Sequence, residues 1–575
     1  MPEKSMPEKS SCSYWVQSSV IMAVLPGIFV LIVSRMLSLR KVGIPPWGKE
    51  MINLSNDEKG FTILGSCGTI EASVATKNRG DAGKKLAGFS EEYGLLADFD
   101  KEADLMFDLL LINGCVITVD SAHTVYQPGY VAVEKDTIAA IGPMSDLPVL
   151  PEAGRVIDLC GHAVLPGLVD AHGHAGHCLI KNLFEYRDDW DDLAEQVYYQ
   201  CTDTEFWRAE GSLAAAERIK FGITTGVSMV GSTPRIDIIE PVGANLEGSS
   251  RVGIRQLSGI GCANGPWPKK ARAWNGKEYT ESTVTPKMAY RSTEEALKAY
   301  NGRHPLETCI VAPGRMGLRP GESAEDNIAH NREMYRLAEE YGVPLHTHAF
   351  AGDIQFLYDT TPEVLKVGLS LTHSTGLSQE EIAILAKTGA YVFHGPATHS
   401  NILKTCPVYE LLQAGAHVAV VTDGTAPDRS YDIWRDMKML QVLQRGRFHD
   451  LSLLPCGKVL ELCTIEPAKA LKLDHLIGSL EVGKKADIIA VDVEQPHLAP
   501  FGDMPVQRLV YHAMGQDVDL TIVDGAVVME GRKLTKVDEK KIIADARGAY
   551  ATMLERLGDP TVTQNPKLYE LTQKM

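Results

Sequence analysis

Short apolar runs alternate with segments of helical periodicity from Val164 to about Leu473. Strands that alternate with helices build a parallel sheet, and the number of repeats fits a (β/α)8 barrel. We therefore predict an α/β fold in which residues 164–475 form such a barrel. The clearest pairs are helix 212–220 with strand 224–229, helix 324–341 with strand 343–348, helix 379–388 with strand 390–393, and helix 408–414 with strand 418–422.

Runs of short strands, separated by turn residues, lie on both sides of this region. They cover residues 107–119, 129–134 and 137–142 before it, and 478–491 and 520–528 after it. The two sets resemble each other. We predict that residues 105–163 and 476–535 together form one small β-sandwich, and that residues 536–575 form a helical tail.

The first 104 residues have a different pattern. Residues 1–5 repeat as residues 6–10, and an uncharged, largely apolar segment near residues 15–34 approaches the length that spans a bilayer. A membrane anchor, a secretory signal, a mitochondrial-type leader and an extension without a role are competing interpretations. We favour an anchor, with a linker over residues 35–104 and the catalytic part in the cytoplasm.

Composition narrows the function classes. The chain has 575 residues, 44% of them hydrophobic, and a net charge of −17, which argues against a nucleic-acid or anionic-membrane surface. The 11 cysteines include no Cys-x-x-Cys pair, which excludes a thiolate zinc cluster and the cysteine-ligated type of zinc deaminase. Scattered thiols suit a reducing compartment.

The most informative residues are His172 and His174, which follow the apolar run 164–169. Side chains two residues apart in a strand point to the same side, so two imidazoles can grip one metal ion there. Barrel enzymes place their sites at the carboxyl ends of the strands. Other predicted strands also end in metal-ligating residues, namely His346 with His348, His373, and Asp423.

These motifs resemble the amidohydrolase superfamily, in the branch of mononuclear deaminases and chlorohydrolases that includes S-adenosylhomocysteine deaminase, guanine deaminase and triazine hydrolases. The resemblance runs from about residue 107 to residue 533. Its most specific pieces are Leu-Pro-Gly-Leu-Val-Asp-Ala-His-Gly-His at 165–174, Phe-Gly-Ile-Thr-Thr at 221–225, Thr-Asp-Gly at 422–424 and Gly-Ser-Leu-Glu-Val-Gly-Lys-Lys-Ala-Asp at 478–487.

The resemblance implies one divalent metal ion, zinc before iron, held by His172, His174, His348 and Asp423. Such an ion lowers the pKa of a water molecule towards neutrality, and Asp423 takes the proton of the attacking water. His373 lies beside the metal in this family and has an auxiliary catalytic role. Homo-oligomers are common in the family, so a homo-oligomer is expected by analogy.

A two-metal centre is the competing arrangement. It normally needs a carboxylated lysine or a glutamate on the fourth strand. The predicted fourth strand, within residues 308–314, has only Cys309 as a soft ligand. We therefore expect one metal.

The chain departs from the pattern after His348. Ring deaminases of this branch usually carry His-x-x-Glu there, and the glutamate carries protons to the ring nitrogen. The corresponding residue is Ala351, and the nearest acid is Asp353. His346 shares a face with His348, so a ligand, a base, a substrate contact and a supporting hydrogen-bond partner are all open roles for it.

Two further residues are substrate-binding candidates. His394 lies in segment 393–401, which resembles the family segment after the seventh strand. Arg429 follows Asp423 closely and could bind an anionic group, although a solvated arginine is the common case. Residues 267–279 are expected to form a surface loop, a candidate lid.

We predict a metal-dependent hydrolase that attacks a carbon–nitrogen bond, other than a peptide bond, of a small heterocyclic molecule, in the manner of a deaminase. A cyclic amide, urea or carbamate hydrolase is the alternative, because those reactions need no protonation of a ring nitrogen. A barrel that serves as a non-catalytic scaffold is a third hypothesis. The complete set of metal-ligating residues argues against it.

Overall fold

The computed structural model divides the chain into two units, residues 1–104 and 105–575. It describes residues 54–57, 60–65, 68–72, 107–184, 189–231, 235–319, 321–366, 368–398 and 404–563. In the first unit, the antiparallel strands β1 (Leu54–Asp57), β2 (Gly60–Gly65) and β3 (Gly68–Ala72) lie where we expected a linker. The hydrophobic segment near residues 15–34 lies outside the described residues. Within the described ranges, no helix is long and apolar enough to cross a membrane.

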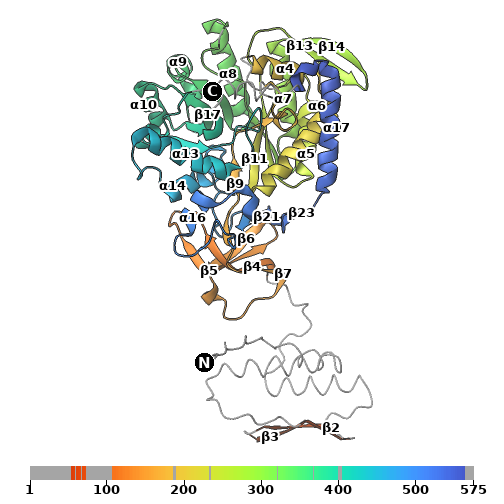
Figure 1. Ribbon diagram of the computed structural model, residues 1–575, viewed down its shortest axis with the longest axis vertical. Helices are drawn as coiled ribbons and strands as arrows, with labels where there is room; N and C mark the ends of the chain where they lie inside the picture. Colours follow the sequence, from red (N-terminus) through yellow and green to blue (C-terminus); the bar gives the residue numbers. More distant parts are fainter. Residues whose placement is uncertain are drawn as a thin grey trace, which may run out of the picture. The chain divides into compact units, whose positions relative to one another are not determined.

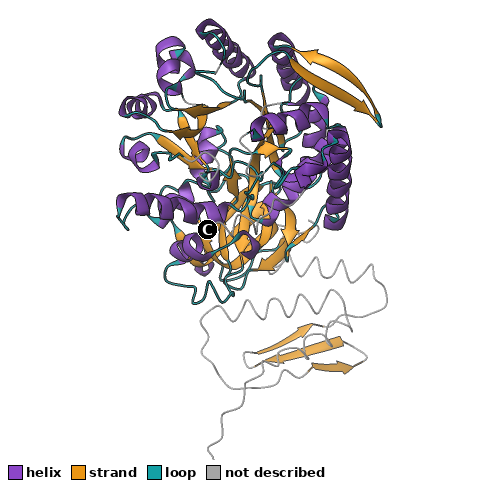
Figure 2. Cartoon of the chain, turned by 45° about the horizontal axis from the view of Figure 1, so that its top comes forward, coloured by secondary structure: helices purple, strands orange, loops and turns teal. Residues whose placement is uncertain are grey.

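The second unit contains a nearly closed barrel of parallel strands, shown with its surrounding helices in Figure 2. β9 and β10 together supply the first strand position, and β9 and β10 both pair with β11. This arrangement confirms the predicted (β/α)8 fold. The strands are β9 (Leu168–Asp170), β10 (His174–Ala175), β11 (Ile223–Val230), β12 (Arg255–Ile260), β15 (Glu307–Val311), β16 (Leu345–Phe350), β17 (Leu369–Thr375), β18 (Tyr391–His394) and β19 (His417–Val420).

Alternate residues of these strands pack in two separate cores. Val227, Leu257 and Ile310 belong to the cluster that fills the barrel interior. Cys309 and Val311 belong instead to the larger cluster between the barrel and its helices. Side chains in a strand alternate between its two sides, so both cores follow from one pattern. Cys309, the soft ligand weighed for a second metal, therefore faces away from the barrel interior.

Helices cover the outside of the barrel, and their ends carry the expected capping residues. In α10, the Ser378 hydroxyl accepts from the backbone N–H of Glu381, whose side chain caps in return, and Gly389 ends the helix in the left-handed conformation. The helices are α4 (Trp190–Gln200), α5 (Thr204–Lys220), α6 (Glu240–Ser250), α7 (Pro286–Tyr300), α8 (Ala324–Tyr341), α9 (Asp353–Thr360), α10 (Gln379–Thr388), α12 (Val408–Gln413), α13 (Ile433–Phe448), α14 (Cys456–Glu461), α15 (Ile465–Ala470), α16 (Pro505–His512) and α17 (Glu539–Leu557).

A second sheet lies at one end of the barrel, and both ends of the catalytic region contribute to it (Figure 1). Its strands hydrogen bond as one nine-stranded sheet, and residues from both halves, such as Leu111 and Ile488, share one core. The strands are β4 (Phe107–Ile117), β5 (Val125–Glu134), β6 (Thr137–Pro143), β7 (Ala153–Asp158), β8 (Ala163–Pro166), β20 (Ile488–Val491), β21 (Val518–Val523), β22 (Ala526–Glu530) and β23 (Lys533–Leu534).

The apolar run 164–169 is not one strand, which corrects our prediction. β8 pairs with β4 and β20 in the second sheet, whereas β9 joins the barrel. The chain crosses between the two sheets at Pro166 and Gly167. Proline has no N–H to donate to a ladder, and a side chain on Gly167 would collide with Thr224, 2.1 Å from the added carbon. The hydrophobic pattern alone could not reveal this break.

The predicted loop 267–279 is also different in the structure. β13 (Lys269–Asn275) and β14 (Glu278–Val284) form an antiparallel hairpin, which projects from the barrel in Figure 1. The exposed side of the hairpin is polar, and this polarity made the segment resemble a loop.

A buried ion pair joins the barrel to the second sheet. Arg255, the first residue of β12, donates to Asp487 Oδ1 at 3.0 Å and to Asp524 Oδ1 at 3.0 Å. Asp487 also accepts the backbone N–H of Asp524, and its own carbonyl accepts the N–H of Gly167. Both side chains of the Arg255–Asp487 pair are less than a tenth exposed. Asp487, the last residue of the 478–487 motif, therefore links the barrel to the second sheet.

We expect Arg255→Met to destabilise the fold by about 3–5 kcal/mol, because it leaves the Asp487 carboxylate buried without its cation. Chemical unfolding followed by circular dichroism measures the loss. Arg155→Met is the control: its partner Glu530 and Arg155 itself are more than two-fifths exposed, so about 0–1 kcal/mol is expected. Equal losses in the two variants would contradict this account.

Candidate metal centre

His172 and His174 lie at the end of the first barrel strand and point to the same spot, as their spacing predicted. His172 is fully buried, and His174 is only 4% exposed. A side chain between them would displace the Arg218 guanidinium, since a carbon added to Gly173 would lie 2.5 Å from its Nη2. Strand β10 then continues from His174, in register with Met229 of β11.

The eighth strand is tied to the first through Asp170. Its buried carboxylate accepts the N–H and the hydroxyl of Thr422 at 3.0 and 2.9 Å, and pairs with the equally buried Arg218 at 3.0 Å. The next residue, Asp423, donates its N–H to the carbonyl of His172 at 3.1 Å. These bonds bring Asp423 directly beside the two histidines.

Four side chains form a group that could hold a metal ion: His172, His174, His348 and Asp423. One ligand atom from each lies within 4.8 Å of all the others. Nε2 of His172 is 2.8 Å from Asp423 Oδ1, and Nε2 of His174 is 3.2 Å from the same oxygen. These are the four ligands that the family resemblance implied.

Hydrogen bonds on the far side of the rings show which nitrogens are free to bind the metal. Nδ1 of His174 is 2.8 Å from the Gly231 carbonyl, and Nδ1 of His348 is 2.6 Å from the Gly314 carbonyl. A carbonyl can only accept, so each Nδ1 carries the proton and each Nε2 carries a lone pair. Lone pairs and a carboxylate that converge in this way repel each other unless a cation lies between them. The donor set therefore fits one divalent ion.

His346 lies behind His172. Its Nε2 is 2.7 Å from Nδ1 of His172, and its Nδ1 is 2.8 Å from the Ser370 hydroxyl. The ring is fully buried and stacks on Phe393. Both ring nitrogens lie within hydrogen-bond distance of groups of the protein, so the geometry favours a supporting role for His346 over the expected substrate contact. It is a partner that orients His172.

Asp423 is held in place by several groups. Burial acts to raise the pKa of its carboxyl, but the Arg429 guanidinium and hydrogen bonds with His172 and His174 outweigh burial, so the pKa lies well below its usual value. The hydroxyl of Thr398 donates to Asp423 Oδ2 at 2.9 Å. Asp423 is therefore a carboxylate at neutral pH, able to accept a proton.

His373 stands next to the four ligands without belonging to them. Its ring stacks on His348 with centroids 5.2 Å apart. Burial lowers the pKa of His373 to about 3, so the imidazole is neutral. Within the described residues its ring nitrogens have no hydrogen-bond partner, and the side chain keeps a small exposed fraction of 8%. It can therefore bond a water molecule or a substrate.

The two predicted substrate-binding residues lie in different surroundings. Arg429 is close to the centre, 3.8 Å from Asp423 Oδ2, and it donates to the carbonyls of Asp423 and Ala426. Phe393 faces the barrel interior, so alternation along β18 places His394 on the opposite side of the strand. The contacts of Arg429 favour a role in holding Asp423 and its loop. The position of His394 does not favour a contact between its side chain and the substrate.

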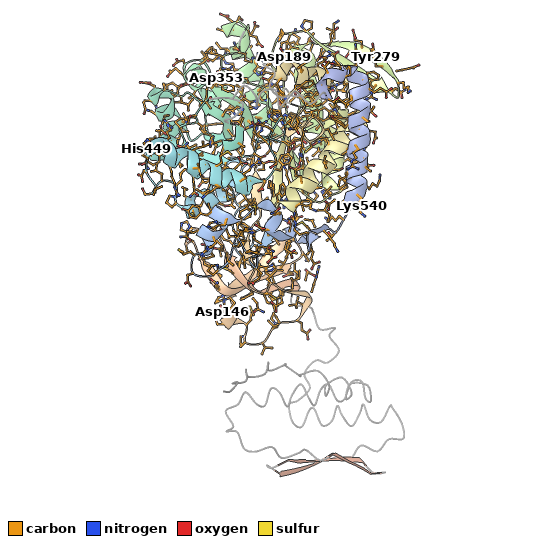
Figure 3. All side chains as sticks on the ribbon, viewed as in Figure 1. Asp146, Asp189, Tyr279, Asp353, His449 and Lys540 are labelled. Carbon is orange, nitrogen blue, oxygen red and sulfur yellow. The ribbon has the colours of Figure 1, made fainter. Side chains whose placement is uncertain are left out.

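Asp353 does not replace the glutamate that related ring deaminases carry at the position of Ala351. Ala351 is exposed just after β16. Asp353, the nearest acid, is fully buried, accepts from the Leu318 and Phe350 N–H groups, and pairs with Arg315 at 2.9 Å. This carboxylate anchors the loop after β15. Figure 3 shows Asp353 at the same end of the unit as Asp189, opposite Asp146, which lies just after β6.

Comparison with known protein families shows to which family the chain belongs. The sequence pattern of the Amidohydrolase family matches residues 163–528, well over half of the chain. The chain belongs to the amidohydrolase family. This result confirms the predicted family and the predicted enzyme class, the hydrolases that act on carbon–nitrogen bonds other than peptide bonds.

Relatives of this amidohydrolase include named deaminases. 5-Methylthioadenosine/S-adenosylhomocysteine deaminase of Syntrophobacter fumaroxidans is 29% identical in an alignment of 451 positions, which covers 76% of this chain and 97% of the relative. 5'-Deoxyadenosine deaminase of Methanosarcina acetivorans is 30% identical in an alignment of 463 positions, which covers 78% of this chain and 99% of the relative.

Solved structures share the fold. An adenosine deaminase from Xanthomonas campestris with bound zinc superposes with a TM-score of 0.66 at 22% identity, over 78% of this chain and 99% of that one. Atrazine chlorohydrolase from Arthrobacter aurescens, complexed with zinc, has a TM-score of 0.63 at 20% identity, over 77% of this chain and 100% of that one.

Sequence reasoning missed the hydroxyl groups that support the centre. Thr398 holds Asp423, and Ser370 holds His346. Serine and threonine are common residues, and no spacing in the sequence marks these two. Only the fold shows that they face the ligands.

We expect His346→Phe to weaken zinc binding by about 10–100-fold, because His172 loses the partner that orients its ring. His346→Gln, whose amide oxygen can still accept from His172, should lose less. Competition with a chelator measures the zinc dissociation constant. His475→Ala, which alters an exposed histidine, should leave it unchanged. Unaltered zinc affinity in His346→Phe would refute the positioning role.

Proposed function

We propose that this amidohydrolase deaminates an amino-substituted nitrogen heterocycle of the adenosine type. The observation that carries the proposal is the convergence of three Nε2 atoms and one carboxylate, with the neutral ring of His373 beside them. The names of the two relatives support it, since both are deaminases of adenosine derivatives. His373 is neutral and has no hydrogen-bond partner among the described residues, which suits a site that handles water and a polar substrate.

Zinc is the proposed ion, held by His172, His174, His348 and Asp423. The adenosine deaminase and the chlorohydrolase structures both contain zinc, which supports this choice over iron. When bound, a divalent ion of this kind acts as a Lewis acid and lowers the pKa of a water molecule towards neutrality.

The side chains themselves divide the remaining work. The Asp423 carboxylate, kept ionised by its neighbours, accepts a proton from the attacking water. Thr398 holds Oδ2 of that carboxylate, which fixes the direction in which the proton is received. His373 donates or accepts a hydrogen bond on the open side of the site, where it helps to orient the water or the substrate.

Hydrolysis of a cyclic amide, urea or carbamate is the second candidate. Ala351 favours it, because these reactions do not require a proton on a ring nitrogen. The third hypothesis, a non-catalytic scaffold, is not favoured, since all four ligands and the ring of His373 are in place.

Other predicted features stay proposals. We infer that Arg429 contacts substrate as well as Asp423, and that His394 has at most an indirect role. All nine cysteines of the described residues are free thiols, which supports a reducing compartment such as the cytoplasm for the catalytic part. Homo-oligomer formation and anchoring by residues near 15–34 are further predictions.

We expect the purified chain to hold about one zinc ion, since one set of four ligands is present. It should release ammonia from 5'-deoxyadenosine or 5-methylthioadenosine faster than from triazines, cyclic ureas or carbamates. Elemental analysis and an ammonia assay over this panel provide the measurement. Cleavage of ureas or carbamates alone would favour the second candidate, and absence of metal would refute both.

Asp423→Asn should lower kcat by about 10²–10⁴-fold, because an amide cannot accept the proton from water. Asp428→Asn, five residues further along and exposed, is the matched control and should keep normal activity. Zinc content of both variants is measured in parallel, so that loss of the ion is separated from loss of proton transfer. Full activity in Asp423→Asn would contradict the assigned role.

A further inference from the structure

The ring of His373 lies beside the metal centre, although the alternation along β17 would turn it the other way. Leu369 and Leu371 pack in the core between the barrel and its helices. Because side chains in a strand alternate, position 373 should face the same way as these two leucines. Its ring instead lies 6.2 Å from that of His172 and 5.2 Å from that of His348, centroid to centroid. A departure from regular strand geometry is therefore needed.

The backbone at the end of β17 provides this departure. His373 has a φ of 73° and Ser374 a φ of 44°, both in the left-handed region that residues with a side chain seldom adopt. The register with β16 shifts at the same point: Ala349 pairs with His373, but the next residue of β16 pairs with Thr375. One extra residue in a strand forms a β-bulge, which re-aims the side chains around it. The bulge at Ser374 turns the His373 ring toward the metal ligands.

Other contacts have to hold the ring in this orientation. Left-handed backbone is unfavourable for these residues, and it persists only where the surrounding structure fixes it. The Ser374 hydroxyl supplies one contact, since it donates to the carbonyl of Leu371 at 3.1 Å. The ring nitrogens of His373 supply none, because they have no hydrogen-bond partner among the described residues. Packing against neighbouring rings therefore decides where the imidazole points.

Two rings of β16 pack against His373. Its imidazole stacks on His348 with centroids 5.2 Å apart and on Phe350 with centroids 5.5 Å apart, at angles of 21° and 24° between the planes. His348 and Phe350 are two residues apart, so they point to the same side of the strand. Ala349 lies between them, packs on the other side, and is the residue that pairs with His373. Of the two rings, only that of Phe350 does not belong to the metal-ligating set.

Phe350 is itself held from behind by a buried ion pair. Asp353 is fully buried and accepts the backbone N–H of Phe350 at 2.8 Å. The same carboxylate accepts from Nε and Nη2 of Arg315 at 2.9 and 3.0 Å. The guanidinium carbon of Arg315 lies 5.1 Å from the centre of the Phe350 ring, within the range of a cation–π contact. The acid that follows Ala351 therefore fixes both the backbone and the ring of Phe350.

We propose that Phe350 is a positioning residue of the reaction, whose ring keeps the His373 imidazole turned toward the metal centre. The proposal rests on the proposed function, in which His373 orients the water or the substrate, and it names the group that fixes this orientation. The competing role for the half-buried ring of Phe350 is a direct contact with the heterocycle. The two roles differ in their kinetics, because a positioning residue acts through His373 and a substrate contact does not.

Phe350→Leu tests the proposal in the full-length zinc-loaded chain, with 5'-deoxyadenosine as substrate. Leucine keeps an apolar side chain but has no ring on which His373 can stack. We expect kcat to fall by about tenfold or more, because a misplaced group is costly to the reaction, and KM to change by less than about threefold. Phe350→Tyr keeps the ring and should hold kcat within about threefold of wild type. Zinc content should be equal in all of these chains.

Phe356→Leu is the matched control. Phe356 is another half-buried phenylalanine, six residues further along on α9, so the same change of side chain is made close to the site. It should alter kcat by less than about twofold. A kcat in Phe350→Leu within about threefold of wild type would overturn the proposal. An increased KM with unchanged kcat in Phe350→Leu would overturn it as well, because that result marks a substrate contact.

Combining Phe350→Leu with His373→Asn provides a second readout, which a purely structural role would not affect. In a chain that already carries His373→Asn, Phe350→Leu should lower kcat by less than about twofold, because the ring that Phe350 positions is gone. Two losses that multiply in full would overturn the proposal, since Phe350 would then act independently of His373. If Phe350→Leu does not fold, Phe350→Met replaces it in every comparison, with the same expectations.

Crystal structures of the zinc-loaded wild type and of Phe350→Leu provide a readout that does not depend on turnover. We expect the His373 ring to leave its position in the variant while His348 keeps its own, and an unmoved His373 ring would overturn the proposal. Failure of the proposed function has a different outcome. A wild-type chain that binds zinc but releases no ammonia from any purine nucleoside would overturn the deaminase assignment, whereas the two crystal structures would still decide whether Phe350 holds His373.

Discussion

The buried carboxylate of Asp170 is the interaction on which the metal centre depends. It binds Arg218 on one side and both donors of Thr422 on the other, so it joins the first and the last strand of the barrel where the two meet. A charge in this position is costly unless it is paired and fully hydrogen-bonded. Because these bonds form only when the first and last strands lie together, the same carboxylate that joins the two strands brings the histidines to Asp423.

The barrel and the four metal-ligating residues could be predicted because they depend on short sequence patterns. The spacing of His172 and His174 set two side chains on one side of a strand, and the barrel placed the end of every strand at one rim. Helix α10 lies where the pattern placed it because a capping serine and a terminal glycine mark its ends. The alternation of helices and strands was sufficient for the fold class.

Other features depend on contacts that sequence does not encode locally. The split between β8 and β9 follows from a proline–glycine step and from the bulk of Thr224, which lies on another strand. The role of His346 follows from a hydrogen bond to a residue 174 positions away. A histidine two residues before a ligand has the same spacing whether it binds metal, substrate or another histidine. Only the three-dimensional contacts distinguish these cases.

The orientation of the three ligand rings has a consequence for how the enzyme is assembled in the cell. Carbonyl groups of Gly231 and Gly314, and the ring of His346, fix the histidines through the protein itself. Little reorganisation is then left for an arriving ion to cause, so folding can be completed before metallation.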